Sequence, residues 1–393
     1  TAPALAAINH LLCPNAAADR VAKIAKNNPD FEFILRKVTF KRSYLCRMVR
    51  ENQILQLLKQ SIEKLSQQED VLRFAEIKNP WFTQKNITVA LDGWIHALND
   101  STSSEWLKSY DFASVNENAN KKLGIIAAGN IPLVGLHDVL CGVLCGYTVW
   151  LKPSSDDETL MKWVIFDWTV QLQQNSIWNA IEIVEQLKGI DAAIATGNNN
   201  SARYFEYYFR HIPHLLRNNR NSVAVLGPQD QLNENDYINL GLDVFQHFGL
   251  GCRNVTKVFL PVGFEFKPLF DVWEQHFADT LFHNKYANNY NYHKALLLMN
   301  LDPHIDAGYI LMNERTQIHS PVGVLNYSYY NDIQEVSADL THNKDVIQCV
   351  VSNLKAIPEI SNILPLGTAQ CPLLSDYADG VDTVEFLLGH CDR

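Results

Sequence analysis

The spacing of apolar residues changes once along the chain, near residue 120. Before that point apolar side chains recur three or four positions apart, and Gln, Lys and Glu fill the positions between them. The clearest run consists of Ile54, Leu57, Leu58, Ile62 and Leu65. This spacing predicts a mainly helical region over residues 1–120.

One segment interrupts the helical spacing. In KNPWFT, residues 78–83, an Asn-Pro pair breaks the helix and leaves Trp81 and Phe82 in a loop. Two large aromatic side chains in a loop serve either internal packing or a partner's surface, and packing is the more common use.

From Leu123 onward strands and helices alternate. LGIIAA reads as a buried strand, Pro132 suits the first turn of a helix that continues to Leu144, and Gly146 suits its end. YTVWL reads as the next strand, so the unit has the length of about 30 residues expected of a parallel βαβ crossover.

The alternation continues to the C-terminal part. DAAIATGNNNSARYFEYYF reads as strand, turn and helix, and further strands are predicted in SVAVLG, VTKVFLP and SPVGVLNYS. Residues 346–357 read as helix before a loop-rich tail from about residue 360. The pattern indicates a doubly wound α/β protein. We expect a cofactor-binding domain over 1–226, helical to 120 and Rossmann-like over 121–226, and a catalytic domain over 227–393.

Composition and charge exclude several classes of function. The 393 residues are 47% hydrophobic and 19% charged, an ordinary globular balance. A net charge of −10 argues against sequence-independent binding of nucleic acid or anionic lipid. No apolar run reaches the roughly 18 residues of a membrane span, and the first residues do not resemble a signal peptide. The eight Cys residues lack the spacing of a disulfide-stabilised scaffold, which predicts free thiols and a cytoplasmic protein.

Three loops follow neighbouring predicted strands: AAGNIP (127–132), KPSS (152–155) and ATGNNN (195–200). Ligands of open parallel sheets bind at this carboxyl edge. A single glycine after a strand is usually only a turn, and no GxGxxG dinucleotide fingerprint occurs. Three such loops together indicate a ligand site.

Two polar residues stand out in these loops. Lys152 could reach the hydroxyls of a ribose, and Asn130 offers an amide donor near the sheet edge. Taken singly, the first would more often be a surface lysine and the second a turn residue or helix cap.

Cys252 is the candidate nucleophile. It follows Gly-Leu-Gly and precedes a predicted strand, so its thiol is reachable, whereas Cys141 and Cys145 lie on an apolar helix face and belong to the core. We expect no metal site, because Pro213 disrupts the helix that would align His211 and His214.

Together these residues resemble the aldehyde dehydrogenase superfamily, and within it the LuxC-type acyl-CoA reductases, which reduce fatty acyl groups to aldehydes. The resemblance covers roughly residues 75–393. It rests on AGNIPLVGLHDVLCGVLCGYTVWLKPSS, ATGNNNSARYFEYYF, LGCRN, SPVGVL and LLSDYADGVDTVEFL, in that order. It implies an aldehyde dehydrogenase-like fold.

The resemblance also implies residue roles. Cys252 would be the nucleophile, and Asn130 would join the Cys252 N–H in an oxyanion hole. Lys152 and Ser154 would hold the adenosine ribose. The full set of implied cofactor-binding residues is Ala128, Gly129, Lys152, Ser154, Ser155, Thr196, Gly197, Asn198 and Gln317.

The sequence departs from the superfamily in two places. Hydrolytic members carry a glutamate in the segment that here is IPHLLRNNRNSVAVLG, which has no Asp or Glu. Without that base water attack should be slow, and coenzyme A becomes the natural acyl acceptor and product. The ribose-binding glutamate aligns with Gln317, which can still bond a hydroxyl.

The resemblance predicts NADPH as cofactor, with NAD possible, because Ser155 stands where NAD-using members often carry a glutamate that repels the 2′-phosphate. We expect an acyl-CoA substrate and a homodimer. Two alternatives stay open: an acyl phosphate or acyl-protein as donor, or a catalytically degenerate nucleotide-binding scaffold.

Overall fold

The computed structural model describes residues 49–112, 115, 118–177, 181–197 and 199–389. The chain divides into two compact units, Thr1–Gln53 and Ile54–Arg393. Of the first unit only residues 49–53 are described, and they are helical. The second unit carries both sheets and all of the candidate site.

The region before residue 120 is helical, as predicted. Helix runs through residues 54–65, followed by α4 (Glu69–Lys78), α5 (Gln84–Ala97) and α6 (Asp100–Lys108). The five apolar residues at helical spacing between Ile54 and Leu65 are all buried.

The loop between α4 and α5 is used for packing. Phe82 is buried, and the Trp81 ring lies 5.5 Å from that of Phe248 and 5.0 Å from that of His283. The packing interpretation of KNPWFT is therefore confirmed.

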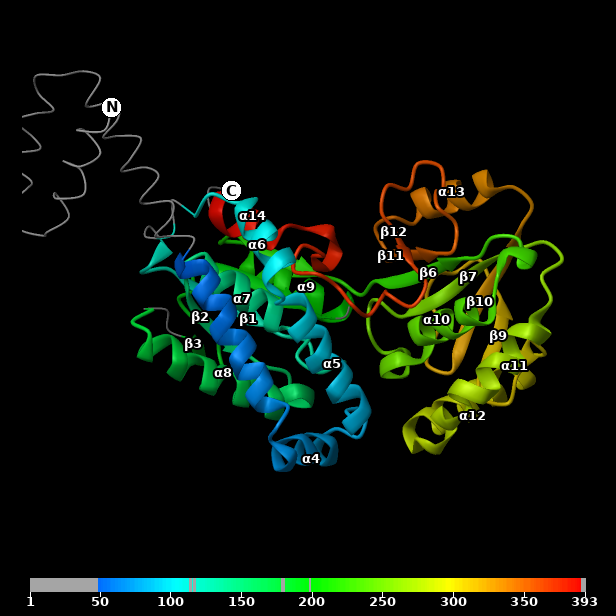
Figure 1. Cartoon of the computed structure of the whole chain (residues 1–393), viewed down its shortest axis with the longest axis horizontal. Coiled ribbons are helices and arrows are strands. Elements are labelled where there is room, and N and C mark those ends of the chain that lie inside the picture. The colour runs from blue at the N-terminus through cyan, green and yellow to red at the C-terminus, as the bar shows by residue number, and fades with distance from the viewer. Residues whose placement is uncertain (1–48, 113–114, 116–117, 178–180, 198, 390–393) are drawn as a thin grey trace, which may run out of the picture. The chain divides into compact units, whose positions relative to one another are not determined.

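A parallel sheet of five strands follows, in the order β3-β2-β1-β4-β5; Figure 1 labels β1, β2 and β3. Its strands are β1 (Lys122–Ile126), β2 (Thr148–Lys152), β3 (Ile181–Ile183), β4 (Ala192–Thr196) and β5 (His214–Arg217). The helices between them are α7 (Leu136–Leu144), α8 (Glu158–Gln174) and α9 (Asn199–Phe209).

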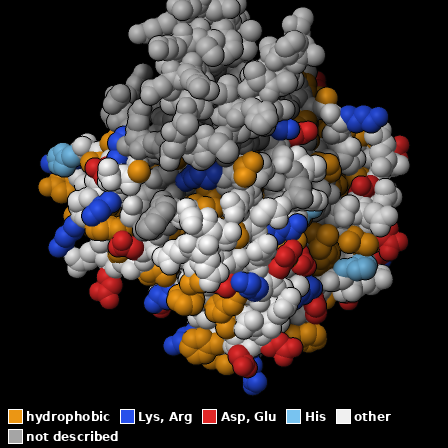
Figure 2. All heavy atoms as spheres, turned by 60° about the vertical axis from the view of Figure 1, so that its left-hand side comes forward, with side chains coloured by type: hydrophobic (Ala, Val, Ile, Leu, Met, Phe, Trp, Pro, Cys, Tyr) orange, Lys and Arg blue, Asp and Glu red, His pale blue; other side chains and the backbone are white. Residues whose placement is uncertain are grey.

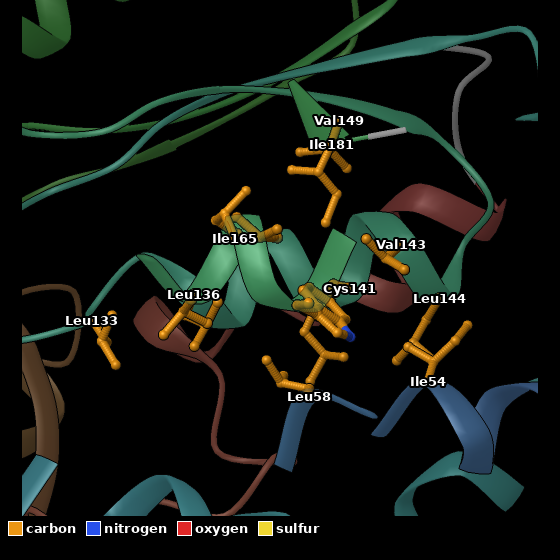
Figure 3. Packing of buried hydrophobic residues seen from close by; sticks show 14 of the residues in the cluster. Ile54, Leu58, Leu133, Leu136, Cys141, Val143, Leu144, Val149, Ile165 and Ile181 are labelled. Carbon is orange, nitrogen blue, oxygen red and sulfur yellow. The ribbon is translucent and has the colours of Figure 1, made fainter. Parts of the chain in front are cut away.

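Alternate residues of β4 show how this sheet is covered on both faces. Ala192 and Ile194 belong to the core shared with α7 and α8, whereas Ala193 and Ala195 pack with Phe209 of α9. The period of two along a strand separates these faces. Figure 3 shows Cys141 of α7 within the first core, so this cysteine is structural.

Helix α7 begins later than its sequence suggests. Pro132 lies in a turn, and the helix starts at Leu136. The turn contains Leu133 at φ +57°, in the left-handed region that L-residues rarely adopt. Gly146 ends the helix at φ +85°, as predicted.

The second sheet has seven strands in the order β12-β11-β6-β7-β10-β9-β8, parallel except for the β8–β9 pair. The strands are β6 (Asn221–Val225), β7 (Val255–Pro261), β8 (Ile305–Asp306), β9 (Leu311–Glu314), β10 (Val324–Tyr330), β11 (Ile347–Ser352) and β12 (Ile363–Pro365). The remaining α-helices are α10 (Glu234–Phe245), α11 (Phe266–Phe277), α12 (Asn284–Met299), α13 (Ile333–His342) and α14 (Thr383–Gly389).

The predicted helix over 346–357 is wrong. Residues 347–352 form β11, which pairs with β6 and β12. A short apolar run fits a buried strand as well as a helix, and here the neighbouring strand edges decide. The change of sheet falls between β5 and β6, ahead of residue 226; the division into two functional domains stays a prediction.

Charged residues of both signs are interspersed over the face shown in Figure 2. Across the described ranges, no helix is both long enough and apolar enough to cross a membrane.

Candidate active site

The three predicted ligand loops leave the same edge of the first sheet. Ile126 at the end of β1 pairs with Lys152 of β2 and with Ala195 of β4. Because these strands are parallel and in register, the residues that follow them lie side by side. Lys152 is exposed at this edge, and Thr196 ends β4 half-buried.

Two of these loops are in direct contact. A Cβ added at Gly129 would lie 2.5 Å from both Cβ and Oγ of Ser154, so only glycine fits there without displacing the second loop. Ser154 in turn accepts a hydrogen bond from the N–H of Asp156 at 3.3 Å. Ala128 is half-buried beside this contact, and Ser155 is exposed.

The side chain of Asp157, which directly precedes α8, makes no capping hydrogen bond to that helix. Ser154 caps the short 3₁₀ turn over Ser155–Asp157, and Asp157 turns inward instead. Its Oδ2 accepts a hydrogen bond from the N–H of Leu133 at 2.6 Å, and burial raises its pKa well above the usual range. Asp157 therefore joins the loop after β2 to the loop after β1.

The third loop packs against its own helix. The N–H of Gly197 donates to the carbonyl of Arg217 at 3.2 Å, and an added Cβ would lie 2.9 Å from the side chains of Ser201 and Phe205. The close approach of α9 thus requires glycine here. The predicted contact residue Asn198 lies outside the described residues.

The backbone before Cys252 is unusual. His247, Phe248 and Gly249 have φ values of +51°, +57° and +78°. Two consecutive non-glycine residues in the left-handed region store strain, and such strain persists only where the surroundings hold it.

Asn254 supplies much of that support. Its fully buried side chain accepts from the N–H of Gly251 at 2.8 Å and donates to the carbonyl of Gln246 at 2.8 Å. One amide thus ties both ends of the turn, which fixes the position of Cys252 within it.

Cys252 itself is half-buried. Burial raises the pKa of its thiol. The guanidinium of Arg253 and the backbone N–H of Cys252 itself lower this pKa, but burial is the larger effect. Its carbonyl accepts a hydrogen bond from Ser222 Oγ at 3.1 Å. The free thiol is therefore the resting form, and a nucleophilic role requires loss of its proton.

Asn130 reaches the turn that carries Cys252. Its Nδ2 donates to the carbonyl of Leu250 at 2.7 Å, and its side chain is otherwise exposed. The predicted amide donor and the predicted nucleophile, 122 positions apart in the sequence, thus belong to one local structure. The second N–H of the amide remains available to a carbonyl oxygen.

The last predicted residue, Gln317, lies before β10. Its side chain is exposed, and its carbonyl accepts from Asn326 Nδ2 at 3.1 Å. The buried Lys257 donates to the preceding carbonyl, that of Thr316, at 2.8 Å.

Known proteins match this chain in three-dimensional structure but not in sequence. No protein-family model and no curated protein matches this chain. Solved structures do match it, among them aldehyde dehydrogenase 21 from Physcomitrella patens in complex with succinate, with 10% identity, a TM-score of 0.58, and coverage of 86% of this chain and 84% of that one. The chain has the aldehyde dehydrogenase fold.

Other proteins of the aldehyde dehydrogenase fold match equally well. An acetylating aldehyde dehydrogenase from Geobacillus thermoglucosidasius covers 86% of this chain and 89% of its own, with 10% identity and a TM-score of 0.56. An NADP-dependent enzyme from E. coli covers 82% and 78%, with 12% identity and a TM-score of 0.58.

Within this aldehyde dehydrogenase fold, the C-terminal tail reaches the Cys252 turn, which sequence reasoning missed. Arg253 donates to the carbonyls of Ala369 and Asp376, each at 3.3 Å. The buried carboxylate of Asp243 accepts from the N–H groups of Gly367 at 2.6 Å and Ala369 at 3.0 Å. No local sequence pattern predicts these contacts, because the two residues of each pair are more than 100 positions apart in the sequence.

Two further thiols lie on this side of the fold. Cys349 Sγ is 3.0 Å from Ser222 Oγ, the same hydroxyl that bonds the Cys252 carbonyl, and Cys371 is exposed. Cys141 and Cys145 are buried in the core, as predicted. No group of three or more potential metal-binding side chains occurs in the part of the chain that the structure describes.

Proposed function

We propose that this protein reduces an acyl-CoA thioester to the aldehyde with NADPH, by way of an acyl group carried on Cys252. The observation that supports this most strongly is the link from Asn130 to the turn of Cys252. It joins the turn that carries the half-buried Cys252 thiol to an amide donor at the edge of a sheet whose loops suit a nucleotide. The proposal follows the LuxC-type resemblance of the sequence.

The protein's own residues would act in a defined order. The thiolate of Cys252 attacks the carbonyl carbon, and the C–S bond to coenzyme A breaks, so coenzyme A leaves as a thiolate that takes up a proton. The Asn130 amide and the Cys252 N–H would stabilise the negative oxygen of the tetrahedral intermediate. Nicotinamide, when bound, supplies the hydride. Collapse of the resulting thiohemiacetal frees the aldehyde and restores the Cys252 thiolate.

The residues at the sheet edge fit a dinucleotide. Gly129 and Gly197 bring backbone close to the edge, and Lys152 is exposed beside them. Asp157 Oδ1 is buried and has no hydrogen-bond partner among the described residues, which is typical of a site that a ligand completes. NAD+ complexes have been solved for proteins of this fold, one from Mycobacterium tuberculosis and one from Bacillus cereus.

Coenzyme A rather than water is the expected partner of the acyl group. Residues 212–227 contain no Asp or Glu, so the base used by hydrolytic members is absent from that segment. The carboxylate of Asp379 acts on the Cys252 thiol electrostatically and raises its pKa, but it pairs with Arg220 at 3.2 Å. The match to a solved acetylating aldehyde dehydrogenase supports this choice.

The deciding experiment combines turnover with a binding control. NADPH oxidation is followed over a panel of acyl-CoA chain lengths for the native protein, C252A and C252S. Both variants should lose turnover and still bind nucleotide. Undiminished turnover in either variant would remove the proposal.

The two alternatives have separate tests. An acyl phosphate or acyl-protein donor would support turnover where acyl-CoA does not. A nucleotide-binding scaffold would show no turnover, and an acyl thioester would not protect Cys252 from thiol labelling. The expected homodimer is checked by light scattering, where a monomer mass would contradict it.

A further inference from the structure

Ser222, the second residue of β6, lies between two thiol-bearing residues. Its Oγ donates to the carbonyl of Cys252 at 3.1 Å, and the same oxygen is 3.0 Å from Sγ of Cys349 in β11. It also accepts a hydrogen bond from the N–H of Cys349 at 3.2 Å. Cys252 and Cys349, 97 positions apart in the sequence, are therefore separated by a single hydroxyl group.

The strand pairing is irregular on both sides of Ser222. The strand order places β6 between β11 and β7, and Figure 1 labels all three. In β11, two residues, Gln348 and Cys349, stand opposite Ser222 alone. In β7, Thr256 is the extra residue. Because a β-bulge changes the direction of the side chains in the bulged strand, the bulge in β11 accounts for a thiol that contacts Ser222.

The two cysteines share one electrostatic environment. Each is half-buried, so part of its surface is open to a small oxidant. Burial raises the pKa of both thiols, and the guanidinium of Arg253 lowers both. The charge of Cys252 acts on Cys349 as well and raises its pKa. Since only the thiolate reacts, Arg253 favours the reactive form at both positions.

We propose that Cys349 is the resolving thiol of Cys252, so that oxidation of Cys252 by hydrogen peroxide ends in a reversible Cys252–Cys349 disulfide. The inference goes beyond the proposed function, because it needs only the two thiols and an oxidant. The disulfide would block any reaction that uses the Cys252 thiol. It would also protect that thiol from irreversible oxidation.

The chemistry takes two steps. The Cys252 thiolate attacks one oxygen of the peroxide, the O–O bond breaks, and a sulfenic acid forms while hydroxide leaves and takes up a proton. The Cys349 thiolate then attacks the Cys252 sulfur, and the S–O bond breaks. The hydroxide released takes up a proton. Together the two thiols lose two electrons and two protons, and the peroxide is reduced to two molecules of water.

Forming the disulfide requires a local change only. The two Cβ atoms of a disulfide lie about 3.5–4.5 Å apart, so the Cys349 thiol must leave the Ser222 hydroxyl. Cys252 lies in the turn before β7, which begins at Val255, so its side chain can rotate without breaking strand pairing. Cys371 is the alternative partner, because it is exposed and Arg253 lowers the pKa of its thiol too.

The test treats the reduced full chain with hydrogen peroxide and then labels free thiols with iodoacetamide. The native protein should lose labelling of Cys252, show a Cys252–Cys349 cross-link in a non-reducing peptide map, and regain the labelling after dithiothreitol. In C349S the sulfenic acid has no partner, so it should proceed to the sulfinic acid, which dithiothreitol does not reduce. C371S is the matched control and should behave as the native protein.

Three results would each overturn the inference: a cross-link from Cys252 to a different cysteine, no cross-link of Cys252 at all, or equal recovery of labelling in C349S and the native protein. The peptide map of the native protein decides the first two without any variant. Iodoacetamide reports on the thiol without an acyl donor. A protein that forms the cross-link but is not acylated by acyl-CoA in its reduced form would therefore keep this inference and lose the proposed function.

Discussion

The side-chain amide of Asn130 donates a 2.7 Å hydrogen bond to the carbonyl of Leu250, two residues before Cys252. This bond connects the loop after β1 in the first sheet to the turn that precedes β7 in the second. It gives the amide a fixed position, which a donor to a developing oxyanion needs, because a preorganised donor pays no reorganisation cost during the reaction.

If that donor acts in acylation, N130A should slow the formation of acyl-Cys252 roughly 100- to 1,000-fold. Single-turnover mixing with an acyl-CoA and quenching for intact mass measures this step directly. S222A is the matched control, because it removes the hydrogen bond to the Cys252 carbonyl without removing the amide. An N130A rate within threefold of the native rate would contradict the assignment.

Acyl-enzyme should accumulate when nicotinamide is withheld. No carboxylate in residues 212–227 activates water, so the Cys252 thioester is expected to hydrolyse slowly. The intact mass should rise by one acyl group in the native protein, C349S and C371S, and should not rise in C252S. Rapid release of free fatty acid without a mass increase would reveal another base.

Cofactor choice should depend on Ser155. A glutamate at this exposed position would place a negative charge beside the 2′-phosphate, and a like-charge contact near a surface is worth on the order of a few kcal/mol. S155E should therefore shift the ratio of kcat/KM values toward NADH at least about tenfold. S66E adds the same charge on an exposed turn elsewhere and should leave the ratio unchanged; an unmoved ratio in S155E would exclude Ser155 as the discriminator.

The attachment of the C-terminal tail should depend on pH. Burial raises the pKa of Asp243 to about 7, above its value in the unfolded chain, although hydrogen bonds from Gly367 and Ala369 oppose the shift. The native state then holds a proton that the unfolded state has lost, so the free energy of unfolding should fall between about pH 4 and pH 7 and level off above. This one group contributes at most about 1.4 kcal/mol per pH unit.

Urea unfolding at pH 5, 6, 7 and 8 measures this dependence. D243N cannot titrate, so the stability difference between native protein and D243N should shrink as the pH rises toward 7. A difference that stays constant over this range would show that Asp243 does not ionise there. Asp157 and Asp379 also have raised pKa values, but they contribute equally to the pH dependence of the native protein and of D243N, so the difference between the two proteins isolates Asp243.

A buried ion pair should matter more than the exposed ones. Arg217 at the end of β5 pairs with Asp138 of α7 at 2.7 Å, and both side chains are at least nine-tenths buried. D138N would leave the guanidinium charge without its partner, at a cost of about 3–5 kcal/mol in the free energy of unfolding. D271N breaks the exposed pair with Lys267 and should change stability little. Equal effects of the two variants would contradict the role of burial.

The sequence by itself determined the alternation of strands and helices and the surroundings of the main candidates. Hydrophobic spacing and turn residues are local, so β1, β2, β4, β6, β7 and β10 could be predicted from short stretches. The same local reasoning predicted a glycine-containing turn for Cys252, which is half-buried in the structure, and assigned Cys141 to the core. The aldehyde dehydrogenase fold followed from the resemblance.

Only the tertiary structure decided which distant residues these segments contact. The run over 347–352 became β11 because β6 and β12 offer it unpaired edges. Asp157 bonds Leu133 rather than capping its own helix, because burial brings that N–H within reach. The hydrogen bond from Asn79 Nδ2 to the carbonyl of Asp156 depends on the packing of α4 against α8. Such partners are chosen by proximity in space, which the spacing of residues along the chain does not encode.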